Sequence, residues 1–145
     1  MNRFLPLCLL LLLPSAAYAQ MNAFGLSSKV AGSSIFVGHP LPDGDESGLV
    51  YVYQLSEDGE AWEFAAELMA SDARPGDAFG YSIALDGDHL AIGAPSLDGL
   101  GGAVYLFVRN PETGDWQEIA KTTGTAEAPI GGAVAISGST LVTSG

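Results

Sequence analysis

The loop Asp43-Gly44-Asp45-Glu46-Ser47-Gly48 is the stretch of this chain whose residue types best suit chemistry. Oxygen-bearing side chains alternate there with glycine, as they do at the start of a calcium-binding loop. Calcium takes about 6–8 oxygen ligands, however, and no acid follows where a bidentate ligand is needed. Asp43, Asp45 and Ser47 are therefore kept as calcium candidates, while a solvated loop is the expected state and no metal or other cofactor is assigned.

The sequence contains few residues of the types that usually carry out catalysis. The only histidines are His39 and His89, and the single cysteine, Cys8, lies in an N-terminal apolar stretch that is expected to be removed. This excludes a Cys/His nucleophile, and no pattern supports a Ser-His-Asp site. Paired carboxylates such as Asp43 and Asp45 could serve a glycosidase, but that chemistry needs a desolvated pocket that raises one carboxyl pKa. We therefore expect no enzymatic activity and name no catalytic residue.

Residues 1–19 have the pattern of a secretory signal peptide. Arg3 supplies a positive charge, Phe4–Leu13 an apolar run, and Ala17-Tyr18-Ala19 a small-x-small cleavage signal. An apolar run of about ten residues is shorter than the roughly 20 that span a bilayer, so no transmembrane segment is expected. The sequence predicts export, to the cell surface or beyond it, with residues 20–145 as a mature chain that lacks cysteine and hence disulfides.

The chain is strongly acidic, with 17 Asp and Glu against 5 Lys and Arg and a net charge of −12. Nucleic acids and anionic membrane surfaces select for basic patches, so neither is an expected partner. The acids are spread through turns and are not gathered in one run, which is typical of a solvated surface. The charge therefore excludes two partner classes and indicates no particular ligand.

An internal repeat organises the rest of the chain. Phe24-Gly25 recurs as Phe79-Gly80, and the segment LSSKVAGSSIFVGHP aligns without a gap with YSIALDGDHLAIGAP. Further on, GLVYVY recurs as GAVYLF, and a third copy begins at Ile130-Gly131. Residues 20–145 are therefore divided into unit one (23–77), unit two (78–128) and a truncated unit three (129–145).

Each full unit predicts four short strands, because apolar and polar residues alternate between glycine-containing turns. In residues 79–95 two segments of alternating apolar and polar residues flank a glycine turn, which is the pattern of a β-hairpin. A helix over Ala61–Ala70 is the weaker alternative, since the aligned residues of unit two favour a strand. The expected strands are Leu26–Ala31, Ile35–Gly38, Leu49–Leu55 and Trp62–Met69 in unit one, and Gly80–Leu85, His89–Gly93, Ala103–Arg109 and Trp116–Lys121 in unit two.

Four antiparallel strands in a period of about 50 residues fit a β-propeller blade, which buries its faces by stacking on neighbouring blades. The predicted fold is thus all-β, with about two and a quarter blades present. Propellers close with roughly 4–8 blades, so we expect the N-terminal part of a longer protein in which further blades of the same chain follow. A ring built from several short chains is the alternative, although its half-blades would expose strand edges.

Several motif residues resemble a known repeat. Phe79-Gly80, Gly93-Ala94-Pro95 and Gly101-Gly102-Ala103-Val104-Tyr105 are similar to the FG-GAP repeat of the seven-bladed integrin α propeller and of many exported microbial proteins. The resemblance implies a ring of seven blades, an extracellular setting, and a role in adhesion or in protein or carbohydrate recognition. The residues that carry the motif in units one and two are Phe24, Gly25, Phe79, Gly80, Gly93, Ala94 and Pro95.

The chain departs from this family's pattern in two respects. Unit one has Gly38-His39-Pro40 in place of GAP. Calcium-binding members carry a D-x-D-x-D-G-x-x-D loop between the first two strands of a repeat, whereas the turns at Gly32, Gly87 and Gly138 are short, and only the second has carboxylates. The family's metal sites are therefore not carried over.

Aromatic residues recur at equivalent places of the two full units. They are Tyr51, Tyr53 and Trp62 in unit one, and Tyr105, Phe107 and Trp116 in unit two. Recurrence at blade-equivalent positions favours packing between blades over a platform that stacks carbohydrate rings.

These observations predict a non-enzymatic, exported interaction module that recognises its ligand through loops at one rim of a propeller. The loops to test first are Pro40–Gly48 and Ala94–Gly102, the longest in their units. One alternative is the propeller part of a larger secreted protein whose calcium-dependent or hydrolytic activity lies in regions missing here. Another is a purely structural spacer.

Overall fold

The computed structural model describes residues 23–40, 46–96 and 101–145. Within these ranges the regular structure consists of ten β-strands, and no helix there is long and apolar enough to cross a membrane. The predicted signal peptide, residues 1–19, lies outside the described residues. So do Asp43 and Asp45, and residues 97–100 of the second rim loop.

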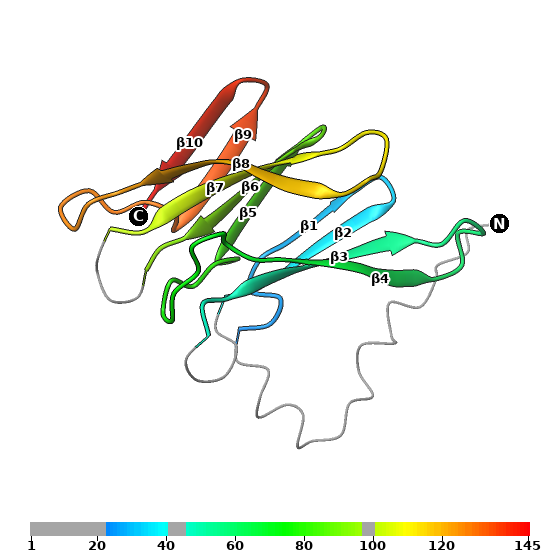
Figure 1. Ribbon diagram of the computed structural model, residues 1–145, viewed down its shortest axis with the longest axis horizontal. Helices are drawn as coiled ribbons and strands as arrows, with labels where there is room; N and C mark the ends of the chain where they lie inside the picture. Colours follow the sequence, from blue (N-terminus) through cyan, green and yellow to red (C-terminus); the bar gives the residue numbers. More distant parts are fainter. Residues whose placement is uncertain (1–22, 41–45, 97–100) are drawn as a thin grey trace, which may run out of the picture.

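The strands form two four-stranded antiparallel sheets and one hairpin, each in chain order (Figure 1). This confirms the prediction of an all-β fold with four antiparallel strands in each full unit. Blade 1 consists of β1 (Ser28–Ala31), β2 (Ser34–His39), β3 (Leu49–Leu55) and β4 (Trp62–Leu68). Blade 2 consists of β5 (Ser82–Asp86), β6 (His89–Ala94), β7 (Ala103–Arg109) and β8 (Trp116–Thr123), and unit three contributes β9 (Ala133–Ser137) and β10 (Thr140–Ser144).

The first strand of each full unit begins two residues later than the sequence predicts. Leu26 donates its backbone N–H to the carbonyl of Ala23, and Tyr81 does the same to Ala78, so a turn precedes each strand. The helical alternative over 61–70 is wrong, because β4 pairs with β3 along its length. A bulge interrupts that pairing, and an equivalent bulge lies between β7 and β8.

The first two strands of every unit are joined by a two-residue turn. The turn glycines Gly32, Gly87 and Gly138 have φ of +56°, +57° and +54°. A positive φ at the first turn position is typical of type II′ hairpins, which match the twist of the flanking strands. A calcium loop of the family type does not fit in these connections.

The two blades share one hydrophobic core. Each sheet has an upstream face, toward the preceding unit, and a downstream face, toward the following one. Phe36, Val50, Val52 and Leu68 lie on the downstream face of blade 1 and are buried. They pack against the upstream face of blade 2, where Leu90, Ile92, Tyr105 and Phe107 are buried with Phe79. Because successive side chains of a strand point to opposite faces of the sheet, each sheet has two apolar faces.

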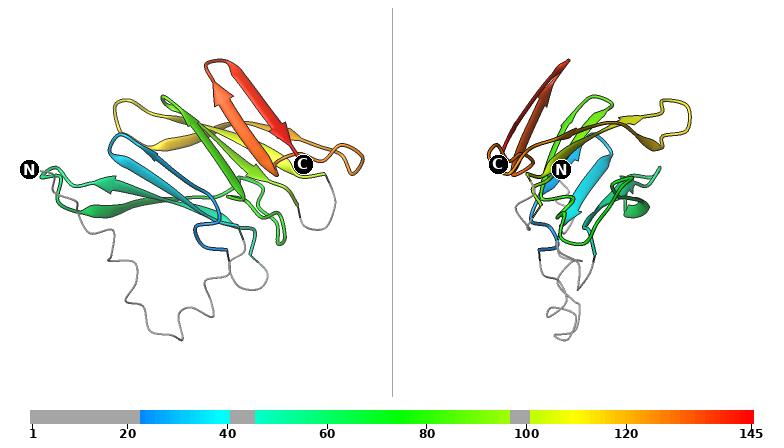
Figure 2. Two further views of the ribbon diagram at one scale, coloured as in Figure 1. Left: turned by 180° about the vertical axis from the view of Figure 1, so that it is seen from behind. Right: turned by 60° about the vertical axis from the view of Figure 1, so that its left-hand side comes forward.

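The downstream face of blade 2 packs in turn on unit three. Ala84, Ala91 and Val104 are buried there against Ile130, Val134 and Ile136. The two sheets and the hairpin therefore stack face to face along the chain (Figure 2). Small residues on blade 2 at this contact allow the β9–β10 hairpin to approach closely.

Candidate functional site

The FG-GAP motif residues build the contact between consecutive units. Phe79 is fully buried, and its ring lies 5.3 Å from that of Tyr105 and 6.1 Å from that of Phe107. Ala94 is buried on the same face. In unit one the equivalent Phe24 is half-buried, and its ring contacts His39 and Tyr51. The motif phenylalanine thus closes one end of a blade's upstream face.

The motif glycines allow the backbones of two units to touch. Ser27 donates its hydroxyl to the carbonyl oxygen of Gly80 at 2.7 Å, and the next unit repeats this bond from Ser82 to Gly131 at 2.8 Å. A Cβ on Gly93 would lie 2.2 Å from the Gly131 oxygen. We call this repeated contact of serine, glycine and carbonyl the seam. Phe79, Gly80, Gly93 and Ala94 of the motif therefore have a structural role at the contact between units.

The calcium candidates are only partly described. Asp43 and Asp45 lie outside the described residues, and Ser47 forms a long 3.4 Å hydrogen bond from its hydroxyl to the carbonyl of Gly48. Across 23–40, 46–96 and 101–145, no three His, Cys, Asp or Glu side chains gather into a group that could hold a metal. Asp86, the carboxylate at the second hairpin, instead accepts the backbone N–H of Gly138 at 2.6 Å.

The two histidines lie apart in the fold. His39 is on blade 1, with its ring edge-on to Phe24 at 5.6 Å and parallel to Tyr51 at 6.3 Å. His89 is exposed at the start of β6, at the opposite end of the strands from the rim loops. Among the described residues, the two histidines therefore share no site, and neither ring nitrogen of His39 has a hydrogen-bond partner.

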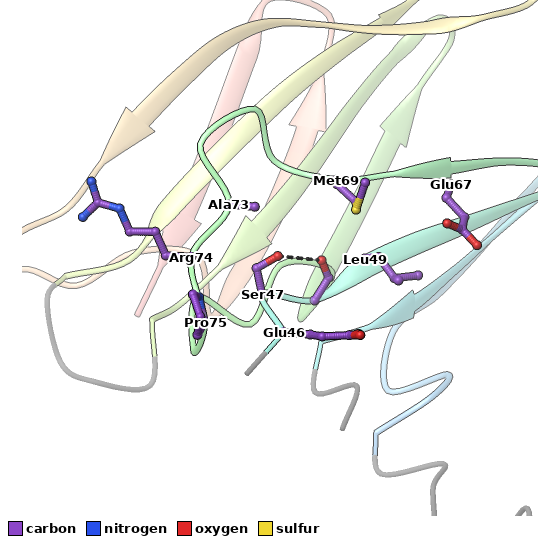
Figure 3. Close-up of a pocket in the computed structure, with 9 residues that line it drawn as sticks. Glu46, Ser47, Leu49, Glu67, Met69, Ala73, Arg74 and Pro75 are labelled. Atoms are coloured by element: carbon purple, nitrogen blue, oxygen red, sulfur yellow. Dashed lines mark hydrogen bonds between the residues drawn. The ribbon is translucent and has the colours of Figure 1, made fainter. Parts of the chain in front are cut away.

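An open groove of about 420 Å³ lies where the first rim loop meets the connector that follows β4 (Figure 3). The loop contributes Glu46, Ser47 and Gly48, and the two strands contribute Leu49 of β3 and Glu67 of β4. The segment after β4 contributes Met69, Ala73, Arg74 and Pro75. Acidic, basic and apolar side chains thus surround one depression at the rim that the sequence singles out. This combination suits binding of a polar ligand with an apolar part.

The groove is acidic on one side and basic on the other. Glu67 pairs across the strands with Tyr51, and burial, followed by the charge of Glu67, raises the pKa of the Tyr51 hydroxyl. The backbone N–H of Arg74 is held by the carboxylate of Asp77 at 2.9 Å, which fixes the connector that carries the guanidinium. The close-up shows the Arg74 side chain on the far side of the groove from Glu46 and Glu67 (Figure 3).

The side chains of this groove are specific to unit one. The strands that border the groove recur in unit two, whereas its long side chains do not. The unit-two counterparts of Glu67 and Met69 are Lys121 and Thr123, and the shorter connector of unit two, residues 124–129, contains no basic residue. Because the two units share a fold without sharing these side chains, the blade fold does not require them, and they are free to serve another function.

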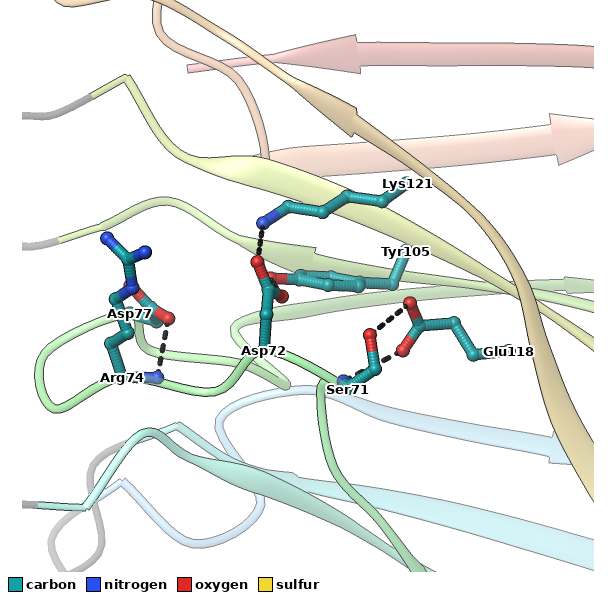
Figure 4. A network of polar contacts seen from close by, with 7 residues as sticks. All are labelled: Ser71, Asp72, Arg74, Asp77, Tyr105, Glu118 and Lys121. Atoms are coloured by element: carbon teal, nitrogen blue, oxygen red, sulfur yellow. Dashed lines mark hydrogen bonds and ion pairs between the residues drawn. The ribbon is translucent and has the colours of Figure 1, made fainter.

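A polar network joins the same connector to blade 2 (Figure 4). Asp72 accepts hydrogen bonds from Tyr105 Oη at 3.0 Å and from Lys121 Nζ at 2.5 Å. Ser71 donates its backbone N–H and its hydroxyl to the carboxylate of Glu118, at 2.9 and 2.8 Å. The hydrogen bond from Lys121 holds the pKa of Asp72 below its usual value, and burial raises the pKa of Tyr105 to about 12.

Sequence reasoning located the rim loop but not the connector residues that complete the groove and the network. Ala70–Ala78 has no strand pattern and no motif, so the sequence alone predicts only a polar link between units. The one available signal was the difference between aligned positions, such as Glu67 against Lys121. Opposite charges at equivalent positions of two units indicate that the two positions have different neighbours, but they do not show which residues those neighbours are.

Comparison with known proteins gives one family. Residues 62–107 match the FG-GAP repeat, from β4 of blade 1 into β7 of blade 2. The matched stretch contains Phe79, Gly80, Gly93, Ala94 and Pro95, the residues that form the seam and the adjoining core. A search of the curated proteins found no match to the chain. The predicted resemblance is confirmed for residues 62–107, which are similar to an FG-GAP repeat and lie in four-stranded antiparallel sheets like the blades of a β-propeller.

Proposed function

We propose that this chain is an exported, non-enzymatic interaction module of the FG-GAP propeller type. It serves in adhesion, or in recognition of an extracellular protein or carbohydrate, at the cell surface or outside the cell. The FG-GAP match and the four-stranded blades support the module type. The signal-peptide pattern of residues 1–19 supports export.

The observation that carries the proposal is the groove between the first rim loop and the connector after β4. The side chains of Glu46, Met69 and Arg74 lie outside the seam, while the backbone of the same loop contacts unit two, where Ser47 accepts the N–H of Phe79. Loops held by a rigid scaffold are the usual place for recognition residues. Glu46 and Arg74 supply opposite charges across the groove, and Met69, whose side chain is 56 % exposed, supplies apolar contact area.

The proposal is tested by binding of the full chain to immobilised extracellular matrix proteins and to a glycan array. Glu46→Gln and Arg74→Ala should each weaken the strongest interaction by about tenfold, the effect of losing one good polar contact. Glu112→Gln is the matched control, because Glu112 is exposed in the β7–β8 turn at the opposite rim.

Two results would contradict the proposal. One is binding that survives both groove substitutions unchanged. The other is turnover of the bound protein or glycan by the purified chain, since this would make the module an enzyme.

A further inference from the structure

The polar network of Figure 4 fastens the start of the connector, residues 70–78, to blade 2. Glu118 accepts both the backbone N–H and the hydroxyl of Ser71, at 2.9 and 2.8 Å. Lys121 Nζ lies 2.5 Å from the carboxylate of Asp72. Each of these hydrogen bonds has a charged partner and is therefore stronger than a neutral one. Two consecutive residues of the connector are thus held by side chains of the neighbouring blade.

The end of the connector is held by backbone hydrogen bonds. Gly76 donates its N–H to the carbonyl of Glu46 in the rim loop, and the carbonyl of Asp77 accepts the N–H of Ser96 in the second rim loop. The carboxylate of Asp77 also accepts the N–H of Arg74 at 2.9 Å. The connector is therefore held at two places, one near each end.

The groove takes three of its lining residues, Ala73, Arg74 and Pro75, from the segment between these two places. All three are exposed, so burial does not fix their positions. An exposed segment with few buried contacts opens locally at low cost unless other bonds hold it. The bonds to Glu118 and Lys121 therefore help to keep the basic side of the groove in place.

The connector of unit two is held differently. It comprises residues 124–129, and Thr125 and Ala128 exchange backbone hydrogen bonds with each other, at 3.1 and 3.0 Å. This connector is closed by its own backbone, whereas that of unit one depends on side chains of the next blade. The dependence thus occurs in the unit that has the groove.

The network acts on the connector more than on the fold as a whole. The side chains of Lys121 and Asp72 expose 29 % and 47 % of their surface. Ion pairs as exposed as this one contribute little to global stability. Loss of the network should therefore loosen the connector while the sheets stay folded.

We propose that Glu118 and Lys121 are positioning residues for the groove, which hold the connector so that Arg74 faces its acidic side. The inference rests on the proposed recognition at the groove and extends that site to a second blade. Neither residue lines the groove, so both act through the connector. A ligand that binds only the positioned connector loses affinity in proportion to the fraction of chains in which the connector is out of place.

Hydrogen exchange followed by mass spectrometry tests the positioning without a ligand. Lys121→Met and Glu118→Ala should each speed exchange in residues 71–77 of the full chain by about threefold to tenfold, while β3 and β7 keep their protection. Lys121→Arg keeps a cation beside Asp72 and should keep the parent rate. Lys29→Met is the matched control, because it removes the same charge from an exposed site on β1.

Binding to the matrix protein or glycan that gives the parent chain its strongest signal is the second readout. Lys121→Met should weaken this binding by about threefold to tenfold, whereas Lys121→Arg and Lys29→Met should leave it unchanged. A role in global stability alone would speed exchange in β3 and β7 as well, and it would leave the affinity of the folded chain unaltered.

The positioning role is overturned if exchange in residues 71–77 stays at the parent rate, if the strands accelerate equally, or if Lys121→Arg behaves as Lys121→Met does. It is also overturned if Arg74→Ala weakens binding and Lys121→Met does not. Failure of the proposed function gives a different result. Arg74→Ala would then bind as the parent chain does, and the exchange rates alone would decide whether the connector is positioned by blade 2.

Discussion

Gly93 lies where the backbone of unit three leaves no room for a side chain. Its Cβ would approach the Gly131 carbonyl oxygen and the Ser82 hydroxyl, both at 2.2 Å. Gly38 occupies the same place in unit one, where a Cβ would lie 2.1 Å from the Gly80 oxygen. The backbone φ of Gly93 lies in the ordinary negative range, so the steric contact and not the conformation explains this glycine.

At this scale we predict that Gly93→Ala destabilises the chain by about 1–3 kcal/mol, the usual cost of forcing an extra methyl group into packed atoms. The obstacle is backbone and cannot rotate away. Urea unfolding followed by circular dichroism measures the change. Gly132→Ala is the matched control, because its Cβ would lie 3.3 Å from the Ser144 oxygen, a contact that a shift of a few tenths of an ångström relieves. Equal unfolding midpoints for the two variants would show that the seam tolerates a side chain.

At the scale of elements, the two motif phenylalanines show how a neighbouring blade changes the role of a residue. Phe79 and Phe24 occupy equivalent places in their units. Phe79 is fully buried between blades, whereas Phe24 is half-buried, and its ring contacts among the described residues are to His39 and Tyr51 of unit one. Burying a phenylalanine contributes about 1.5–3 kcal/mol relative to leaving it exposed. The same motif residue therefore contributes differently at the two places.

We expect Phe79→Ala to destabilise the chain by about 3–5 kcal/mol, as is typical of a buried phenylalanine that leaves a cavity. Phe24→Ala should cost clearly less, because solvent already reaches that ring. Thermal unfolding of the two variants beside the parent chain gives the comparison. If Phe24→Ala were as damaging as Phe79→Ala, a segment other than the described residues would have to cover unit one.

Most of the elements could be predicted from the sequence because the information that defines them is local. Alternating apolar residues between glycine turns located the eight strands of units one and two, and the repeat favoured a strand over a helix at β4. The turns before Ser28 and Ser82 were missed, because the backbone bonds that close them do not depend on side-chain pattern. The groove and the Asp72 network were also missed. The groove forms because the connector turns back onto the rim loop, where the N–H of Gly76 meets the carbonyl of Glu46. The network forms because blade 2 stacks on blade 1 and brings Tyr105 and Lys121 to Asp72. Neither contact follows from local sequence pattern.

At the scale of the whole molecule, stability depends on contacts between blades that respond to pH. Tyr105 is buried and donates its hydroxyl to Asp72, and its pKa is raised from 10.0 to about 12. A raised pKa in the folded state means that the folded chain holds this proton more tightly than the unfolded chain. The resulting stability is fully present below pH 10 and is lost as the pH rises toward about 12.

We therefore expect Tyr105→Phe to flatten the loss of stability between pH 10 and about 12, because the variant has no phenol to ionise there. The measurement is the urea midpoint across this range, with tyrosinate absorbance recorded in parallel. Tyr81→Phe is the control, since Tyr81 is 37 % exposed. A profile of Tyr105→Phe that follows both the parent and the Tyr81→Phe chain would show that this phenol does not control alkaline unfolding.

The seam has a consequence for how such a chain can change over generations. Its carbonyl belongs to one unit, and the serine and glycine that receive it belong to the unit before. When a duplication or deletion adds or removes whole repeat units, each new junction again places a serine and a glycine of one unit against the carbonyl of the next, wherever in the unit the break falls. A substitution on one side of a junction, in contrast, must fit residues of the neighbouring unit that have not changed. Lineages of this chain can therefore alter their length by complete periods more readily than they can alter the small residues at which two periods meet.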